Sequence, residues 1–264
     1  AVPTTPRSPV ILLRAWFTTP CGTDRLMEFS YQAIGVIRSP YRQKFATPRQ
    51  PNLVSEAEAD ILFEDGFDHK DCMRGLEQFS HLWLLWHFHQ TSELGWSPLV
   101  QPPRLGGKQK LGVFASRSPF RPNPIGLSVV RNLGSQTINS RLILKVGGID
   151  LVDETPVLDI KPYLAYADAV SQARSGFATE KPGACWDVNF TDSALEALSR
   201  YQSTYPNLKA FIVSVLQQDP RPAWRASGDD DKQYGMTLYD LNIKWLVTNG
   251  HIEVREIRPS VSND

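Results

Sequence analysis

The stretch from residue 111 to residue 127 reads Leu111-Gly112-Val113-Phe114-Ala115-Ser116-Arg117-Ser118-Pro119-Phe120-Arg121-Pro122-Asn123-Pro124-Ile125-Gly126-Leu127. Its first five residues are apolar enough to predict a buried strand, and the prolines that follow exclude a helix and hold the backbone extended. Arg117 and Arg121 stand in this stiffened loop, where planar guanidinium groups suit a phosphate or a carboxylate. The alternative is a connection whose arginines simply face water.

The segment around this loop is basic. Between Glu93 and Asp150 there is no acidic residue, and the basic residues there are Arg104, Lys108, Lys110, Arg117, Arg121, Arg131, Arg141 and Lys145. Such separation of charge, in a chain whose formal net charge is zero, favours an anionic partner, and RNA is the commonest. The alternative is that the fold places these residues against the acidic stretch between Glu56 and Glu77.

Short strands separated by turns predict a mainly β domain. The expected strands are residues 31–37, 59–63, 81–90, 127–131, 141–146 and 157–160, with breaks at Gly134, Gly147, Gly148 and Pro156. In the third of these strands, one face carries Leu82, Leu84, Trp86 and Phe88 and is expected in the core. This spacing favours a closed or partly closed β-barrel over alternating β and α units. The chain has no Gly-x-Gly-x-x-Gly turn, so a nucleotide would need a non-Rossmann pocket.

A small α+β domain is expected at residues 187–258, after a linker at 169–186. Thr191 is expected to cap a first helix, and a second helix is predicted at 209–217. Two strands, at residues 236–247 and 251–257, are expected to flank an Asn-Gly turn. The barrel domain would then cover residues 29–168, and residues 1–28 form an N-terminal extension that is expected to be poorly ordered.

The composition argues against a membrane protein, a disulfide-stabilised protein and a metal-binding protein. No apolar run approaches the ~20 residues that span a bilayer, so no membrane association is expected. Three scattered cysteines indicate neither a disulfide framework nor a zinc site, and this favours a cytoplasmic protein. His87 and His89 share one face of a strand, but they have no convincing carboxylate or cysteine partner nearby, and we expect no metal site.

Several ordered blocks resemble the TsaA/YaeB family of tRNA methyltransferases. The matching blocks are residues 34–41, 48–51, 75–83, 116–127, 150–163 and 219–222, so the resemblance covers about residues 29–258. It implies a β-barrel enzyme, typically a homodimer, that uses S-adenosylmethionine (SAM) to methylate N6 of threonylcarbamoyladenosine at position 37 of tRNA. One departure is Glu154, where the family usually has glycine. If that turn needs a positive φ, glutamate costs about 1 kcal/mol there.

The resemblance also implies site residues. The cofactor pocket is expected to contain Ser39, Pro40, Tyr41, Ser80, His81, Arg117, Leu127, Asp150, Leu151, Val152 and Asp153. The acidic residues could hold the ribose or the amino group of SAM and Arg117 its carboxylate, although an ordinary acidic turn between strands would also explain Asp150 to Asp153.

The acceptor nitrogen and the RNA need further groups. The candidates for accepting the proton of the acceptor nitrogen, which the sequence does not rank, are Asp153, Asp159, Tyr163 and His81. Arg121 and Asn123 are expected at the threonyl carboxylate or a phosphate of the substrate. The RNA surface is expected to include Arg104, Lys108, Lys110 and Arg221. Two other functions remain open, a non-catalytic tRNA-binding module and a barrel enzyme acting on a small anionic metabolite.

Overall fold

Six antiparallel strands close into a barrel in the computed structural model, which describes residues 10–18, 24–106, 109–182, 186–221 and 230–260. The strand order around the barrel is β10-β3-β4-β9-β8-β5. Its strands are β3 (Gly35–Arg38), β4 (Glu58–Phe63), β5 (His81–His87), β8 (Ile125–Ile138), β9 (Arg141–Gly147) and β10 (Thr155–Pro162). The barrel predicted from the strand spacing is confirmed.

Alternation along β5 fills the barrel interior. Leu82, Leu84 and Trp86 are buried, whereas the residues between them are partly exposed, as the period of two predicts. The barrel is closed by β10, because Val157 pairs with Gly35 of β3 on one side and with Trp86 of β5 on the other.

The C-terminal part forms a second sheet in the order β11-β14-β13-β12, covered by two helices. Its elements are β11 (Asp187–Phe190), α2 (Asp192–Tyr201), α3 (Leu208–Gln217), β12 (Asp230–Leu238), β13 (Leu241–Thr248) and β14 (His251–Pro259). Both helices were predicted, and Thr191 caps α2 by accepting a hydrogen bond from the backbone N–H of Ala194. A single strand over residues 236–247 is wrong, because a tight turn at Tyr239 and Asp240 divides it into β12 and β13.

The remaining elements are short. They are β6 (Leu99–Val100), β7 (Leu111–Gly112), α1 (Ala165–Asp168) and the 3-10 turns η1 (Lys70–Met73), η2 (Leu76–Gln78), η3 (Ser92–Leu94), η4 (Pro103–Leu105), η5 (Val113–Ala115) and η6 (Gly176–Ala178). None of the helices in the described ranges combines the length and the apolar character needed to cross a bilayer.

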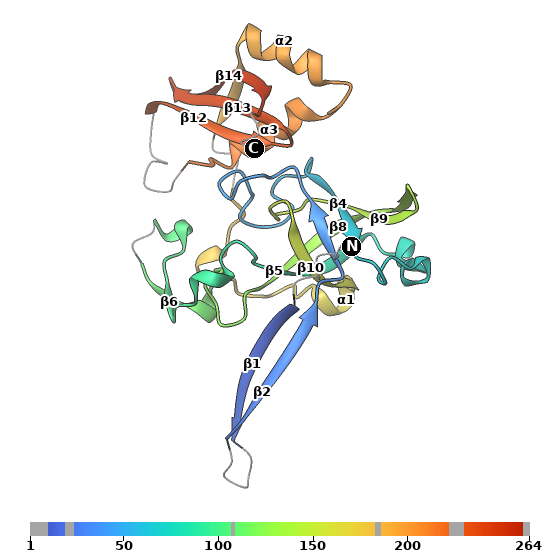
Figure 1. Cartoon of the computed structure of the whole chain (residues 1–264). Coiled ribbons are helices and arrows are strands. Elements are labelled where there is room, and N and C mark those ends of the chain that lie inside the picture. The colour runs from blue at the N-terminus through green and yellow to red at the C-terminus, as the bar shows by residue number, and fades with distance from the viewer. Residues whose placement is uncertain (1–9, 19–23, 107–108, 183–185, 222–229, 261–264) are drawn as a thin grey trace, which may run out of the picture.

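Some expectations for the strands differ from the structure, and one is the break at Pro156, which lies within β10. Residues 111–115 are not a buried strand, because η5 turns the Phe114 side chain outward, where it is 79% exposed. Gly134, at φ +93°, does not end β8 but sits in an irregularity of its pairing with β9. In the segment that includes most of the predicted N-terminal extension, β1 (Val10–Thr18) and β2 (Asp24–Gln32) form a hairpin that projects from the barrel (Figure 1).

Candidate functional site

Two segments that are far apart in sequence meet where β3 ends and β10 begins. Ile37 of β3 pairs with Thr155 of β10, so the residues after one strand lie beside the residues before the other. The Ser39 N–H donates to Asp153 Oδ1 (2.8 Å), and the Ser39 hydroxyl donates to the Leu151 carbonyl (2.7 Å). The Asp153 N–H donates in turn to the Tyr41 carbonyl (2.8 Å). The structure therefore brings the predicted residues 39–41 and 150–153 together.

Asp153 holds this junction in place. It is 6% exposed, and its second oxygen forms an ion pair with Arg42 in addition to the hydrogen bond from Ser39. Both carboxylate oxygens are therefore engaged in holding the junction together. The next residue, Glu154, has φ +64°, which confirms that this turn is one in which glycine would be less strained.

Asp150 lies at the end of a short polar chain inside the barrel. Trp86 Nε1 donates to the Ser128 hydroxyl (3.1 Å), which donates to Asp150 Oδ1 (2.6 Å). Burial raises the pKa of Asp150 from 3.8 to about 6, although the Ser128 hydrogen bond and the positive charge of Arg117 oppose this rise. The Trp86 ring packs so closely on Gly126 that a Cβ there would come within 2.2 Å of it.

The groups around Asp150 have unused hydrogen-bonding capacity. The Tyr41 hydroxyl and Glu56 Oε2 are buried and have no hydrogen-bond partner. Burial, followed by the charge of Asp150, raises the pKa of Tyr41. Arg117 is exposed and donates to Gln50 Oε1. Buried polar atoms without partners are rare, and this cluster is suited to a polar ligand.

A second group of predicted residues lies at the other end of β5 and β10. Ser80 Oγ is 2.9 Å from His81 Nδ1, the Tyr163 N–H donates to the His81 carbonyl (3.0 Å), and the two rings pack edge to face at 6.3 Å. Since β10 has 8 residues, its ends are about 23 Å apart. The structure therefore separates Ser80 and His81 from the junction at Asp153.

Leu127 and Asp159 belong to neither group. Leu127 lies on β8 opposite Leu85 of β5, and its side chain is 50% exposed. Asp159 forms an ion pair with Lys161 (2.8 Å) and accepts a hydrogen bond from the N–H of Ile160 (2.9 Å). Asp159 is therefore already engaged by its own strand.

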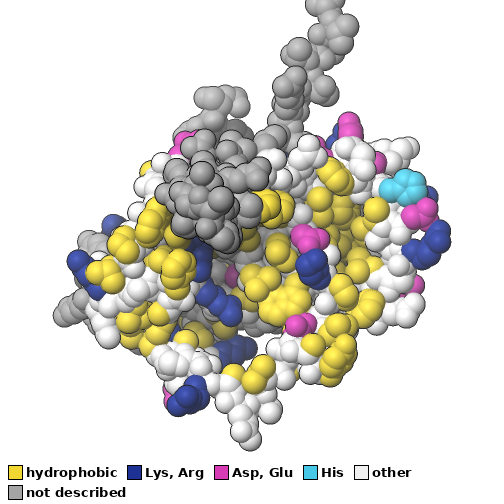
Figure 2. Space-filling view, turned by 90° about the horizontal axis from the view of Figure 1, so that it is seen from below, with side chains coloured by type: hydrophobic (Ala, Val, Ile, Leu, Met, Phe, Trp, Pro, Cys, Tyr) yellow, Lys and Arg dark blue, Asp and Glu magenta, His cyan; other side chains and the backbone are white. Residues whose placement is uncertain are grey.

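Most of the predicted basic surface is exposed. Arg104, Lys110 and Asn123 are exposed, while Arg121 folds back to donate to the Ser116 carbonyl (3.2 Å). Lys108 lies outside the described residues. Figure 2 shows basic side chains spread over one face of the molecule, more of them on the left of the view, with hydrophobic side chains around and between them.

The alternative explanation of the basic segment also holds at one point. Lys145 forms an ion pair with Asp60 (3.0 Å), because β9 pairs with β4. The fold therefore neutralises part of the basic segment with the acidic stretch before it.

Arg221, which was expected at the RNA surface, is buried. Its side chain is 0% exposed and forms two hydrogen bonds of 2.8 Å with the carboxylate of Asp219. Trp186 completes the cluster by donating to the same carboxylate (3.1 Å) and lying 5.0 Å from the guanidinium. The pairing of an acid with an arginine two residues later, between prolines, is a local signal that sequence reasoning missed.

Three site residues were missed by sequence reasoning. Ser128 is a polar residue on the inward face of a predicted strand, and that position could have identified it. Arg42 and Glu56 lie between two of the predicted strands, where sequence carries no signal for which side chains contact the site.

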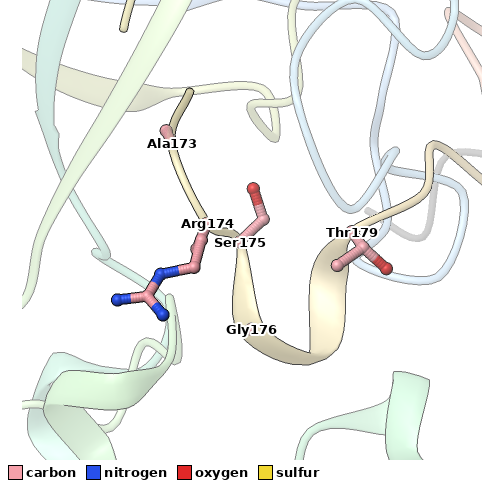
Figure 3. A pocket seen from close by; sticks show the side chains of 5 residues that line it. All are labelled: Ala173, Arg174, Ser175, Gly176 and Thr179. Carbon is pink, nitrogen blue, oxygen red and sulfur yellow. The ribbon is translucent and has the colours of Figure 1, made fainter. Parts of the chain in front are cut away.

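No cluster of possible metal ligands marks another site in the described ranges. Those ranges contain no cluster of three His, Cys, Asp or Glu side chains arranged to hold a metal. An open depression of about 400 Å³ is lined by the turn at residues 173–179, from which Arg174 and Ser175 extend in different directions (Figure 3). It contains none of the residues predicted for the site.

Comparison with known proteins adds independent information. Residues 36–169 match the tRNA-methyltransferase O N-terminal domain, and residues 183–260 match the TrmO C-terminal domain. A tRNA (adenine(37)-N6)-methyltransferase of Escherichia coli is 47% identical over 89% of this chain and 100% of its own length. A human protein of the same name is 39% identical over 57% of this chain and 34% of its own length.

Solved structures agree with this result. A crystal structure of TrmO from Pseudomonas aeruginosa superimposes with a TM-score of 0.73 at 38% identity, covering 88% of this chain and 98% of that one. The two matched domains together account for most of the described chain. This chain therefore belongs to the tRNA-methyltransferase O family.

Proposed function

We propose that this protein is a SAM-dependent tRNA methyltransferase that modifies N6 of the adenine at position 37, beside the anticodon. The observation that carries the proposal is the polar cluster of Asp150, Tyr41, Glu56 and Arg117, in which buried polar atoms lack partners. The names of the relatives support it, since one from Escherichia coli is a tRNA (adenine(37)-N6)-methyltransferase. Another, 45% identical, from Pseudomonas aeruginosa, is a putative S-adenosylmethionine-dependent methyltransferase.

The cluster fits the chemistry of SAM. That molecule carries a cationic sulfonium, an ammonium group, a carboxylate and a ribose diol, and it supplies an electrophilic methyl group. Asp150 and Glu56 would accept hydrogen bonds from the diol or the ammonium group, and Arg117 would bind the carboxylate. Ser39, Pro40, Leu151 and Val152 would form the wall. The task of these residues is to align the acceptor and exclude water, since methyl transfer is an in-line displacement.

Within the tRNA, the nucleoside that we propose as the methyl acceptor is threonylcarbamoyladenosine. Its N6 is a ureido nitrogen whose lone pair is delocalised, so removing its proton assists its attack. Among the four candidates we favour His81. With Nδ1 protonated and donating to Ser80, its Nε2 keeps a free lone pair. Tyr163 packs against its ring and would hold it in place. Arg121 and Asn123 would face the threonyl carboxylate.

A homodimer would complete this site. Within one chain the pair Ser80 and His81 lies at one end of β10, and the junction at Asp153 lies beyond the other end, about 23 Å away. A second copy could bring its own Ser80 and His81 to the first copy's Asp150. Large exposed hydrophobic side chains, which include Phe45, Trp96, Phe114 and Tyr166, offer surface for such contact.

The domain limits form part of the same proposal. We assign a SAM-binding barrel to residues 29–168, a linker to 169–186 and an α+β domain to 187–258, and the matched ranges 36–169 and 183–260 support this division. A tRNA substrate would place the protein in the cytoplasm.

The first test is titration of the protein with SAM and with S-adenosylhomocysteine. We expect saturable binding by wild type and by Arg255→Ala, a control that removes an exposed arginine of β14, and a loss of at least about tenfold in affinity for Arg117→Ala. Transfer of labelled methyl to tRNA with and without threonylcarbamoyl then tests the substrate. Absence of binding to either ligand at millimolar concentration would refute the proposal. Binding of tRNA alone would favour a non-catalytic module, and SAM turnover without tRNA would favour a metabolite enzyme.

The dimer is tested by complementation. Asp150→Asn and His81→Ala chains, each inactive alone, should regain up to about a quarter of the activity when mixed, because one of the two sites in a mixed dimer is intact. Failure of the mixture to regain activity, with a dimeric mass measured by light scattering, would argue that each site belongs to one chain.

A further inference from the structure

The turn between β12 and β13 touches the cofactor segment of the barrel. The N–H of Tyr239 donates to the carbonyl of Pro40 (2.8 Å), and Arg42 Nε donates to the Tyr239 carbonyl (3.1 Å). Tyr41 and Leu238 form an isolated β-bridge between these two bonds. The C-terminal domain is therefore attached by backbone hydrogen bonds to the residues proposed to bind SAM.

This turn is held in an unusual conformation. Tyr239 has φ +54°, a region that costs a residue with a side chain energy and that two-residue hairpins usually give to glycine. Its ring stacks on Tyr205 at 4.4 Å and packs on Phe211 at 5.7 Å, and Tyr205 donates to Asp240 (2.7 Å). Strained positions persist where the surrounding packing determines them, so the stack fixes the direction of the Tyr239 peptide groups.

Arg42 connects this turn to the opposite side of the cofactor segment. Its guanidinium donates to the Tyr239 carbonyl through Nε and forms an ion pair with Asp153 through Nη1. Asp153 also accepts the N–H of Ser39. One side chain thus links the C-terminal turn to both strands of the junction, and displacement of the turn would move Ser39 and Asp153 together.

We infer that Tyr239 and Arg42 are positioning residues for SAM. Through them the C-terminal domain holds the Ser39–Arg42 segment in the conformation that binds the cofactor. The inference rests on the proposed function, since it concerns the same site. Neither residue touches the reacting atoms, and both act through the backbone of Ser39 to Tyr41.

The test compares two turns at opposite ends of β13. Tyr239→Gly keeps the peptide groups but removes the stack, and Asn249→Gly makes the same replacement at a left-handed residue, φ +49°, in the β13–β14 turn. We expect Tyr239→Gly to raise the dissociation constant for SAM and the KM for SAM about three- to tenfold, the effect of loosening one hydrogen bond to a charged group. At saturating SAM, kcat should stay near that of wild type, and Asn249→Gly should bind as wild type does.

Variants of Arg42 provide a second test of the same inference. Arg42→Ala should weaken SAM binding at least as much as Tyr239→Gly, and the double variant should lose less than the product of the two effects because both break one connection. Arg42→Lys keeps a positive charge near Asp153 and should recover part of the affinity. Thermal unfolding and gel filtration establish that each variant is folded.

The outcomes separate the inference from the proposed function. If wild type binds SAM and both Tyr239→Gly and Arg42→Ala bind it with unchanged affinity, the positioning role is refuted and the proposed function stands. A loss of kcat without a change in KM also contradicts the inference. If wild type does not bind SAM, the proposed function fails and the inference fails with it.

Discussion

Replacing Asp150 by asparagine should make the ligand-free protein more stable at neutral pH. Burial raises the pKa of this carboxyl from 3.8 to about 6, so folding costs free energy wherever the unfolded carboxyl is ionised. A rise of this size corresponds to about 3 kcal/mol once the pH is above both values. The asparagine side chain would remain neutral and would keep an oxygen for the Ser128 hydroxyl.

The sign of the pH dependence follows from the raised pKa. Between pH 4 and 6 the native state of wild type binds more protons than the unfolded state, so its stability falls as the pH rises through this window. The advantage of Asp150→Asn should therefore grow from about 1 kcal/mol at pH 4.5 to as much as about 3 kcal/mol at pH 7.5. Urea unfolding of both proteins at these two pH values measures the difference.

Asp153→Asn is the matched control, for which we expect a stability change opposite in sign to that of Asp150→Asn. It removes the charge that pairs with Arg42 at the junction, and it should destabilise the protein at pH 7.5. If Asp150→Asn is no more stable than wild type at pH 7.5, or if its advantage is the same at both pH values, the raised pKa is not the cause and the reasoning is refuted. If the expected gain comes with weaker SAM binding, Asp150 is retained for function at a cost in stability.

The other predictions concern packing and backbone strain. Gly126→Ala would press a Cβ into the neighbouring indole ring and should cost about 1–3 kcal/mol in urea unfolding, whereas Gly235→Ala, which meets nothing closer than 3.8 Å, should cost less. Both Glu154→Gly and Glu154→Ala remove an exposed ion pair, but only the alanine variant keeps the backbone strain at φ +64°. The free energy of unfolding measured in urea should therefore be about 1 kcal/mol larger for the glycine variant than for the alanine variant. Equal free energies would contradict the strain. Arg221→Ala should cost about 3–5 kcal/mol because the buried Asp219 carboxylate loses the guanidinium that neutralises its charge. At temperatures where this variant is folded, its tRNA affinity in a filter-binding assay should equal that of wild type.

Local patterns account for the part of the fold that the sequence predicts. The alternation from Leu82 to Trp86 and the capping threonine of α2 are set by neighbours in the chain, and both appear in the structure as expected. The turn at Tyr239 was not predicted, because it has neither glycine nor asparagine, and its shape comes from stacking on Tyr205, far away in sequence.

The site shows the same division between local and distant information. The motif blocks identify residues 39–41 and 150–153, which the structure places side by side. The motif blocks give no information on the distance between their residues in space, so they could not show that His81 lies at the other end of β10. Arg221 was assigned to the RNA surface from the charge and aromatic character of its neighbourhood in the sequence, and only three-dimensional packing reveals that Asp219 and Trp186 enclose it.

The position of β10 in the barrel has a consequence for the order in which the chain can fold. This strand is the last of the six in sequence, yet it joins β3, the first, to β5. During synthesis, one edge of β3 and one edge of β5 therefore remain without a hydrogen-bonded neighbour until residues 155–162 have left the ribosome. The second sheet repeats the arrangement, because β14 lies between β11 and β13. Each half of the protein is thus closed by its last strand, and we expect its nascent forms to be the stage most exposed to edge-to-edge association and most dependent on chaperones.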